Sequence, residues 1–278
     1  MSLHESFWTY RRWRYLKASL LVVVVAVSAY LADDPPGGAR GGTVLGYTLG
    51  AICLVLVIWL MLFGARKRAY AAKGAPLRGW LSAHVYLGLT LLVLVPLHSG
   101  FQFGWNVHTL AFVLIVAVVL TGTFGVSVYM VVPEKMTENR PGEKLASLFE
   151  RVDDIDTDCR SAAQTLPDTI ARAVASSVSQ TKVGGGLLRQ LSGRDPRCPT
   201  TAALMTIASE APKFEGHVRE EIQKVLELLD HKRSLLRRIR RDTQLKALLD
   251  VWLVMHVPLA VAACAAVAAH VLIVFYYF

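Results

Sequence analysis

Cysteine is scarce and scattered in this sequence, with 4 copies among 278 residues. None belongs to a CxxC or CxxCH motif, so the pattern disfavours iron–sulfur clusters and covalently attached haem. Cys159 and Cys198 share one long polar segment, but a disulfide between them would be unusual in a reducing cytoplasm. We therefore expect both to be thiols.

A phosphate-binding glycine motif is also missing. The only glycine triplet, which begins at Gly184, is not followed by the Lys-Ser or Lys-Thr of a phosphate loop, and we interpret it as a linker. The net charge of +9 would suggest nucleic-acid binding in a soluble protein. Here, however, basic residues gather beside apolar runs, where they are typical of membrane topology, so no nucleic-acid partner is expected.

Long apolar runs dominate the rest of the chain, which is 54% hydrophobic with a mean hydropathy of +0.42. Five runs approach or exceed the roughly 20 residues needed to cross a bilayer: 16–32, 43–63, 80–99, 107–132 and 248–278. The first could be a secretory signal, but it is longer than a usual signal core and a poor cleavage site follows it. The sequence predicts an all-α bundle of five transmembrane helices surrounded by membrane lipid.

The basic residues predict the orientation of this bundle. They precede the first run and separate the second from the third, at Arg11, Arg12, Arg14, Lys17, Arg66, Lys67, Arg68, Lys73 and Arg78. The short connections after the first and third runs contain only Arg40. Because Lys and Arg favour the cytoplasmic side, we expect a cytoplasmic N-terminus and an outside C-terminus in an inner (plasma) membrane.

Residues 133–247 differ from the apolar runs, because they contain 17 of the 21 acidic residues. Apolar positions recur there at helical spacing, as at Leu145, Leu148, Phe149, Val152 and Ile155. Residues 214–244 read as one long helix that could continue into the fifth span. The predicted domains are therefore spans one to four at 1–132, a helical cytoplasmic subdomain at 133–247, and span five at 248–278.

Charged side chains are missing between four histidines that lie deep in the third and fifth spans. His84 and His98 are 14 residues apart, and so are His256 and His270. In an α-helix, 14 residues return to within about 40° of the starting direction and rise about 21 Å. Each helix thus presents two imidazoles on one face, near opposite membrane surfaces.

The two spans run parallel because one span separates them, so His84 lies level with His256, and His98 with His270. Two facing imidazoles can complete a six-coordinate haem iron that transfers electrons. A bare metal site, a proton relay or simple packing are the alternatives for such residues. Small residues at Gly88 and Gly122, near the ligand positions, would leave room for a macrocycle or merely allow close helix packing.

The segments WLSAHVYLGLTLLVLVPLHSG and WLVMHVPLAVAACAAVAAHV resemble the ligand helices of di-haem membrane cytochromes b. That group includes the haem core of cytochrome bc complexes and the transmembrane domain of ferric reductases. The resemblance covers spans two to five and implies two haem b groups, with His84, His256, His98 and His270 as axial ligands. The Pro-Glu-Trp-Tyr quinol-site signature and flavin and NADPH domains are absent from this sequence.

The resemblance implies an electron-transfer subunit of a quinone-linked respiratory oxidoreductase. Its partners would be a quinone pool and a cytochrome c, iron–sulfur or flavoprotein subunit. Possible quinone or propionate contacts are His108, Trp105, Asn106, Arg78 and Trp80, although tryptophans and basic residues at span ends also serve as interface anchors and topology signals.

Two other functions remain open. A membrane anchor or assembly subunit would dock a partner through residues 133–247. A histidine-based proton-coupled transporter would be expected to carry charged residues within its spans, and none lies between the paired histidines.

Overall fold

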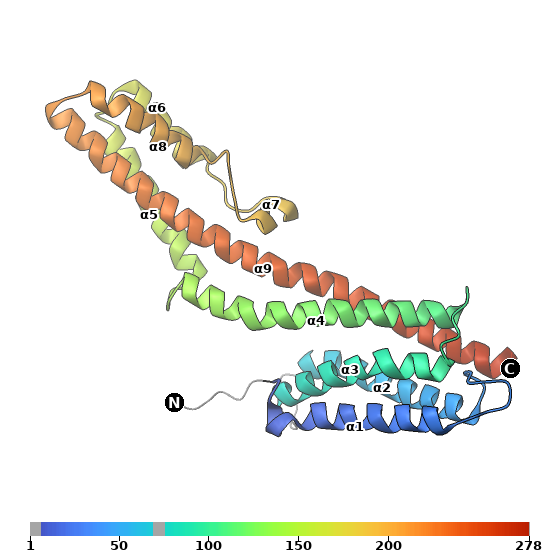
Figure 1. The fold of residues 1–278 in the computed structure, drawn as a ribbon. Helices are drawn as coiled ribbons and strands as arrows, with labels where there is room; N and C mark the ends of the chain where they lie inside the picture. The colour runs from blue at the N-terminus through green and yellow to red at the C-terminus, as the bar shows by residue number, and fades with distance from the viewer. Residues whose placement is uncertain (1–6, 69–75, 278) are drawn as a thin grey trace. The chain divides into compact units, whose positions relative to one another are not determined.

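A computed structural model describes residues 7–68 and 76–277, and within them it contains helices and no strand (Figure 1). Five helices are long and apolar enough to cross a membrane: α1 (Tyr10–Ala32), α2 (Val44–Arg68), α3 (Leu77–Ser99), α4 (Val107–Asn139) and α9 (Gly216–Tyr277). The all-helical fold and the five candidate spans agree with the prediction and suggest a membrane protein. Lys73 of the predicted topology signal and Phe278 at the predicted end of span five lie outside the described residues.

Two of these helices extend beyond their apolar runs. Helix α4 continues through Pro133 to Asn139, whereas the predicted span ended at residue 132. Pro133 thus lies inside α4, and its carbonyl accepts a hydrogen bond from Thr137 Oγ1 at 2.9 Å. Helix α9 includes nearly all of the long helix predicted at 214–244 together with span five, so the predicted continuity is confirmed.

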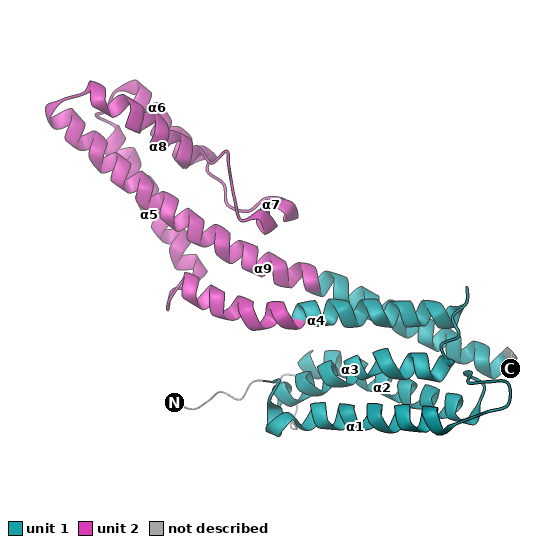
Figure 2. Cartoon of the chain, in the orientation of Figure 1, with its two compact units in different colours: residues 1–125, 253–278 teal, residues 126–252 magenta. Residues whose placement is uncertain are grey.

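The chain divides into two compact units, of which the first contains residues 1–125 and 253–278 (Figure 2). In this unit α3 packs against both α1 and α2. Its interior consists of small and branched apolar side chains, among them Ala26, Leu49, Cys53, Leu91, Leu94 and Ile115. Polar contacts join α1 to α3 at Ser19, whose Oγ donates to the carbonyl of Tyr86 at 2.7 Å and lies 2.6 Å from Thr90 Oγ1.

The second unit contains residues 126–252 and its own apolar core. Its shorter helices are α5 (Leu145–Ala163), α6 (Asp168–Gln180), α7 (Leu187–Ser192), α8 (Pro199–Glu210) and the 3₁₀ turn η1 (Ala211–Lys213). The predicted apolar face of α5 is buried at Leu148, Val152 and Ile155, but Phe149 is 41% exposed. The glycine triplet is an irregular connection between α6 and α7, as expected of a linker.

A buried ion pair lies in the core of this second unit. Lys232, which is fully buried, donates to Asp156 Oδ1 at 2.5 Å and to the carbonyl of Ser177 at 2.9 Å. Burial raises the pKa of the Asp156 carboxyl, and the hydrogen bond and charge of Lys232 oppose that shift. Cys159 and Cys198 are both buried thiols, as expected.

Candidate histidine sites

The four deep histidines lie on two helices of the first unit. His84 and His98 are on α3, and His256 and His270 are on the part of α9 that belongs to that unit. The structure adds a fifth histidine to this set, because His108 at the start of α4 lies beside His98 and His270. We call His98, His108 and His270 the three-histidine cluster, and His84 with His256 the two-histidine site.

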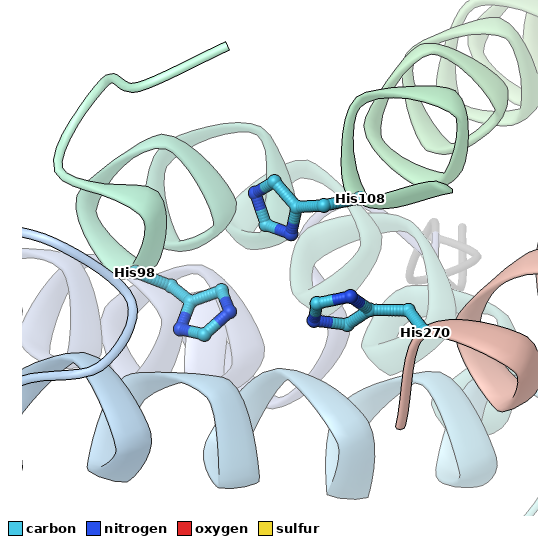
Figure 3. A group of neighbouring side chains, drawn as sticks. All are labelled: His98, His108 and His270. Atoms are coloured by element: carbon cyan, nitrogen blue, oxygen red, sulfur yellow. The ribbon is translucent and has the colours of Figure 1, made fainter. Parts of the chain in front are cut away.

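The rings of the three-histidine cluster face a common space (Figure 3). The ring centroids are 6.2 Å apart for His98 and His270, 5.4 Å for His98 and His108, and 4.8 Å for His108 and His270. One potential ligand nitrogen from each ring can be chosen so that all three lie within 4.8 Å of one another. The three side chains are partly buried and come from three different helices.

The backbone of α2 holds the imidazole of His98. Its Nδ1 lies 2.7 Å from the carbonyl oxygen of Gly46, and because a carbonyl can only accept, Nδ1 carries the proton. The lone pair of the ring is therefore on Nε2. Gly50, one turn further along α2, permits this approach, because a Cβ there would lie 2.7 Å from Cε1 of His98.

In the two-histidine site a side chain of α4 contacts His256. Thr121 Oγ1 lies 3.0 Å from His256 Nδ1 and also lies within hydrogen-bond distance of the carbonyls of Ala117 and Val118. When its single proton goes to one of these carbonyls, the hydroxyl can accept from His256 Nδ1, which leaves the lone pair of the ring on Nε2. A Cβ on the neighbouring Gly122 would lie 3.3 Å from Cε1 of His256, so the ring passes close to the α4 backbone.

His84 contacts two residues of α2. Its ring centroid is 4.9 Å from that of Phe63, and the imidazole also interacts with the backbone of Leu60. Its Nδ1 is buried and makes no hydrogen bond to the residues that the structure describes. A buried ring nitrogen without a partner is costly, unless a ligand takes it. No stacking between the His84 and His256 rings is found within the described part of the chain, although the two are near enough to interact electrostatically.

These positions can be tested against the dimensions of a bis-imidazole haem. Two imidazoles on opposite sides of one iron, each at about 2 Å, place their ring centroids roughly 6 Å apart. The 6.2 Å between His98 and His270 fits this arrangement, and the Nε2 lone pair of His98 is the one that would bind iron. A haem held by these two rings would need the space that the His108 ring occupies, so His108 would have to adopt another rotamer.

The other proposed contact residues divide between two places. Trp105 is fully exposed, and the side chain of Asn106 accepts the backbone N–H of Thr109 at 2.9 Å, which caps the start of α4 beside His108. Trp80, near the start of α3, stacks on Trp59 of α2 with ring centroids 5.1 Å apart. Arg78 lies on the exposed first turn of α3.

Three contributors to these sites were not anticipated from the sequence. Gly46, Gly50 and Thr121 each contact a histidine ring, as described above. The four-residue spacing of the two glycines is typical of close helix packing and is the one signal that could have pointed to them.

Comparisons with protein-family models, with curated proteins and with solved structures found no match for this chain. The geometry of the histidines and their hydrogen-bond partners must therefore carry the functional argument.

Proposed function

We propose that this chain is a di-haem b-type cytochrome that carries electrons across a membrane. Its redox partners would be a quinone pool and a protein redox centre, within a respiratory complex. One observation carries the proposal: in each site Nδ1 of one histidine lies within hydrogen-bond distance of a neighbouring oxygen, and the Gly46 carbonyl holds His98 in the tautomer that leaves its Nε2 lone pair for a metal. Metal-bound histidines commonly donate their other ring nitrogen to a backbone carbonyl or another acceptor in this way.

The spacing of the ligands supports transfer between two centres. His84 and His98 are separated by about 21 Å along α3, which places one site towards each end of the helix. Haem iron with two imidazole ligands would supply one-electron redox chemistry without an open coordination position. Buried apolar side chains, among them Leu91 and Leu94, lie on α3 between His84 and His98.

The quinone end of the proposed path is best assigned to the start of α4. His108 lies among the proposed ligands of one site, and Trp105 and Asn106 adjoin it. An imidazole can accept a proton from a quinol as its electrons leave. Arg78 and Trp80 would then adjoin the site at the other end of α3, where a haem propionate could contact them.

A second candidate function is a membrane anchor or assembly subunit. The observation in its favour is the independent core of residues 126–252, which includes the buried Lys232–Asp156 pair. Such a unit could dock a cytochrome c, iron–sulfur or flavoprotein partner. It predicts that changes on this unit, rather than at the histidines, abolish activity of the complex.

The decisive experiment is haem quantification on the purified chain. Dithionite-reduced minus oxidised spectra and pyridine haemochrome assays should give two haem b per chain. His84→Ala and His270→Ala should each lose one haem. His217→Ala is a matched control, because His217 lies at the exposed start of α9. This variant should retain both haems.

A folded, helical preparation without haem would contradict the proposal. Loss of both haems from His217→Ala would mean that the assay reports stability rather than ligation. If haem is present but an intact complex loses activity only through changes in residues 126–252, the anchor function gains support.

A further inference from the structure

The three-histidine cluster contains one imidazole more than the axial positions of a haem iron can use. The extra ring belongs to His108, whose Nε2 is buried and makes no hydrogen bond to the residues that the structure describes. The proposed function uses His98 and His270 as ligands and requires the His108 ring to move out of the space beside them. As the rings stand, the cluster has the composition of a site for a single metal ion.

We propose that this cluster binds one divalent first-row transition-metal ion, such as Zn²⁺, when the chain is free of haem at this end. His98 would bind through Nε2, because its Nδ1 donates to Gly46. His108 and His270 complete three imidazole ligands. Occupation by the ion and occupation by haem exclude each other, since both require His98 and His270.

The distances are close to those that such an ion requires. Zinc binds histidine nitrogens at about 2.0–2.1 Å, so two ligand atoms of one tetrahedral ion lie roughly 3.4 Å apart. The chosen nitrogens lie within 4.8 Å of one another, and the rings therefore need to close by up to about 1.5 Å. His270 and His108 can make this change by side-chain rotation, while the Gly46 carbonyl keeps His98 in place.

The donor set selects the class of ion. Three neutral imidazoles favour zinc, copper, nickel or iron, whereas calcium and magnesium require oxygen ligands. The cluster contains no carboxylate among the described residues. A fourth ligand can come from water, because the adjoining connection between α3 and α4 is exposed at Phe101, Phe103 and Trp105. Three histidines with one open position resemble a catalytic rather than a closed structural zinc site.

The test is direct metal binding by the full-length chain. The protein is produced under haem limitation, purified in detergent through a tag without histidine, and titrated with Zn²⁺ against a chromophoric chelator. One Zn²⁺ per chain is expected. His108→Gln should weaken binding at least about tenfold, which is the scale on which even indirect partners of metal ligands matter. His217→Gln should leave the affinity unchanged.

Cobalt gives a second readout that does not depend on affinity. Co²⁺ bound by three imidazoles and water should produce visible absorption bands of a four-coordinate ion, and His108→Gln should remove them. Unchanged Zn²⁺ affinity in folded His108→Gln, or a folded wild-type chain that binds no Zn²⁺, would overturn the proposal. Helical circular dichroism and a single peak in size exclusion establish folding for each variant.

The metal-binding proposal can fail separately from the haem proposal. If haem added to the Zn²⁺-loaded chain releases one Zn²⁺ for each haem bound at this end, both are supported. A chain that binds Zn²⁺ through His108 but never binds haem would retain the metal site and lose the cytochrome. A chain that binds two haems but binds no Zn²⁺ in its haem-free form would support the cytochrome and overturn the metal site.

Discussion

The two histidine sites lie on the same pair of helices, yet their histidines are held in different ways. In the two-histidine site, a hydroxyl of α4 holds His256 and an aromatic ring of α2 contacts His84. In the three-histidine cluster, a backbone carbonyl of α2 holds His98 and the three rings contact one another. Similar spacing in sequence therefore produces two sites with different supports, and substitutions in these supports should affect one site at a time.

Gly50→Ala is expected to produce the largest difference between the two sites in haem content. The new Cβ would lie 2.7 Å from Cε1 of His98, so the ring must leave its place beside α2. We expect loss of one haem of two, with the remaining haem at the two-histidine site. Pyridine haemochrome quantification and reduced-minus-oxidised spectra measure this change.

Gly42→Ala is a control for that substitution. Gly42 lies just before α2, and a Cβ there meets nothing within 4 Å. Replacing glycine by alanine inside a helix stabilises it by about 1 kcal/mol, so Gly50→Ala should not lose haem through helix instability. Equal haem content in Gly50→Ala and wild type would show that His98 is not a ligand in the position described.

Thr121→Val should weaken the two-histidine site and leave the cluster unchanged. Valine keeps the shape of threonine but cannot accept the proton of His256 Nδ1. Loss of such a partner typically costs about 10- to 100-fold in metal affinity, because the imidazole loses its fixed tautomer and orientation. Haem retention during dilution or competition with apomyoglobin measures the change.

Thr48→Val supplies the corresponding control on α2. Thr48 Oγ1 donates to the carbonyl of Val44, one turn earlier on the same exposed helix face. It should lose no haem. Similar haem loss in both threonine variants would attribute the effect to general destabilisation rather than to the support of His256.

Gly122→Ala should produce a smaller change at the same site. A Cβ at this position would lie 3.3 Å from Cε1 of His256, so the ring needs to shift by only a few tenths of an ångström. We expect both haems to remain and the midpoint potential of one to change, because ligand orientation tunes the iron. Potentiometric titration checks this, and two unchanged potentials would argue that His256 does not bind the iron.

Much of this arrangement follows from helical periodicity. Four histidines in spans of the same direction are expected to lie at two levels, and His98 and His270 do lie together. The supports of the rings could not be predicted in this way. Whether Gly46 or Thr121 meets an imidazole depends on the rotation of α2 and α4 about their axes, and apolar residues surround these spans so evenly that the sequence does not define a facing side.

The role of His108 also depends on a side-chain direction that the sequence does not define. The sequence shows that His108 lies at the start of a span, at the same end as His98 and His270. It does not show in which direction the side chain points. Helix propensity and hydropathy do not predict the direction of this side chain, since the first turn of a helix can face in any direction. Only the three-dimensional arrangement brings its ring to 4.8 Å from that of His270.

His108→Gln should have the smallest effect on haem and is the most informative about the cluster. If His108 accepts a proton from quinol, glutamine should slow quinol oxidation by about 100-fold or more, the usual contribution of a general base. Both haem spectra should remain, because His98 and His270 keep their places as ligands. Stopped-flow reduction of the protein by a quinol separates this step from haem content. Unchanged reduction would remove His108 from quinone chemistry, while loss of one haem would make it a ligand in place of His98 or His270.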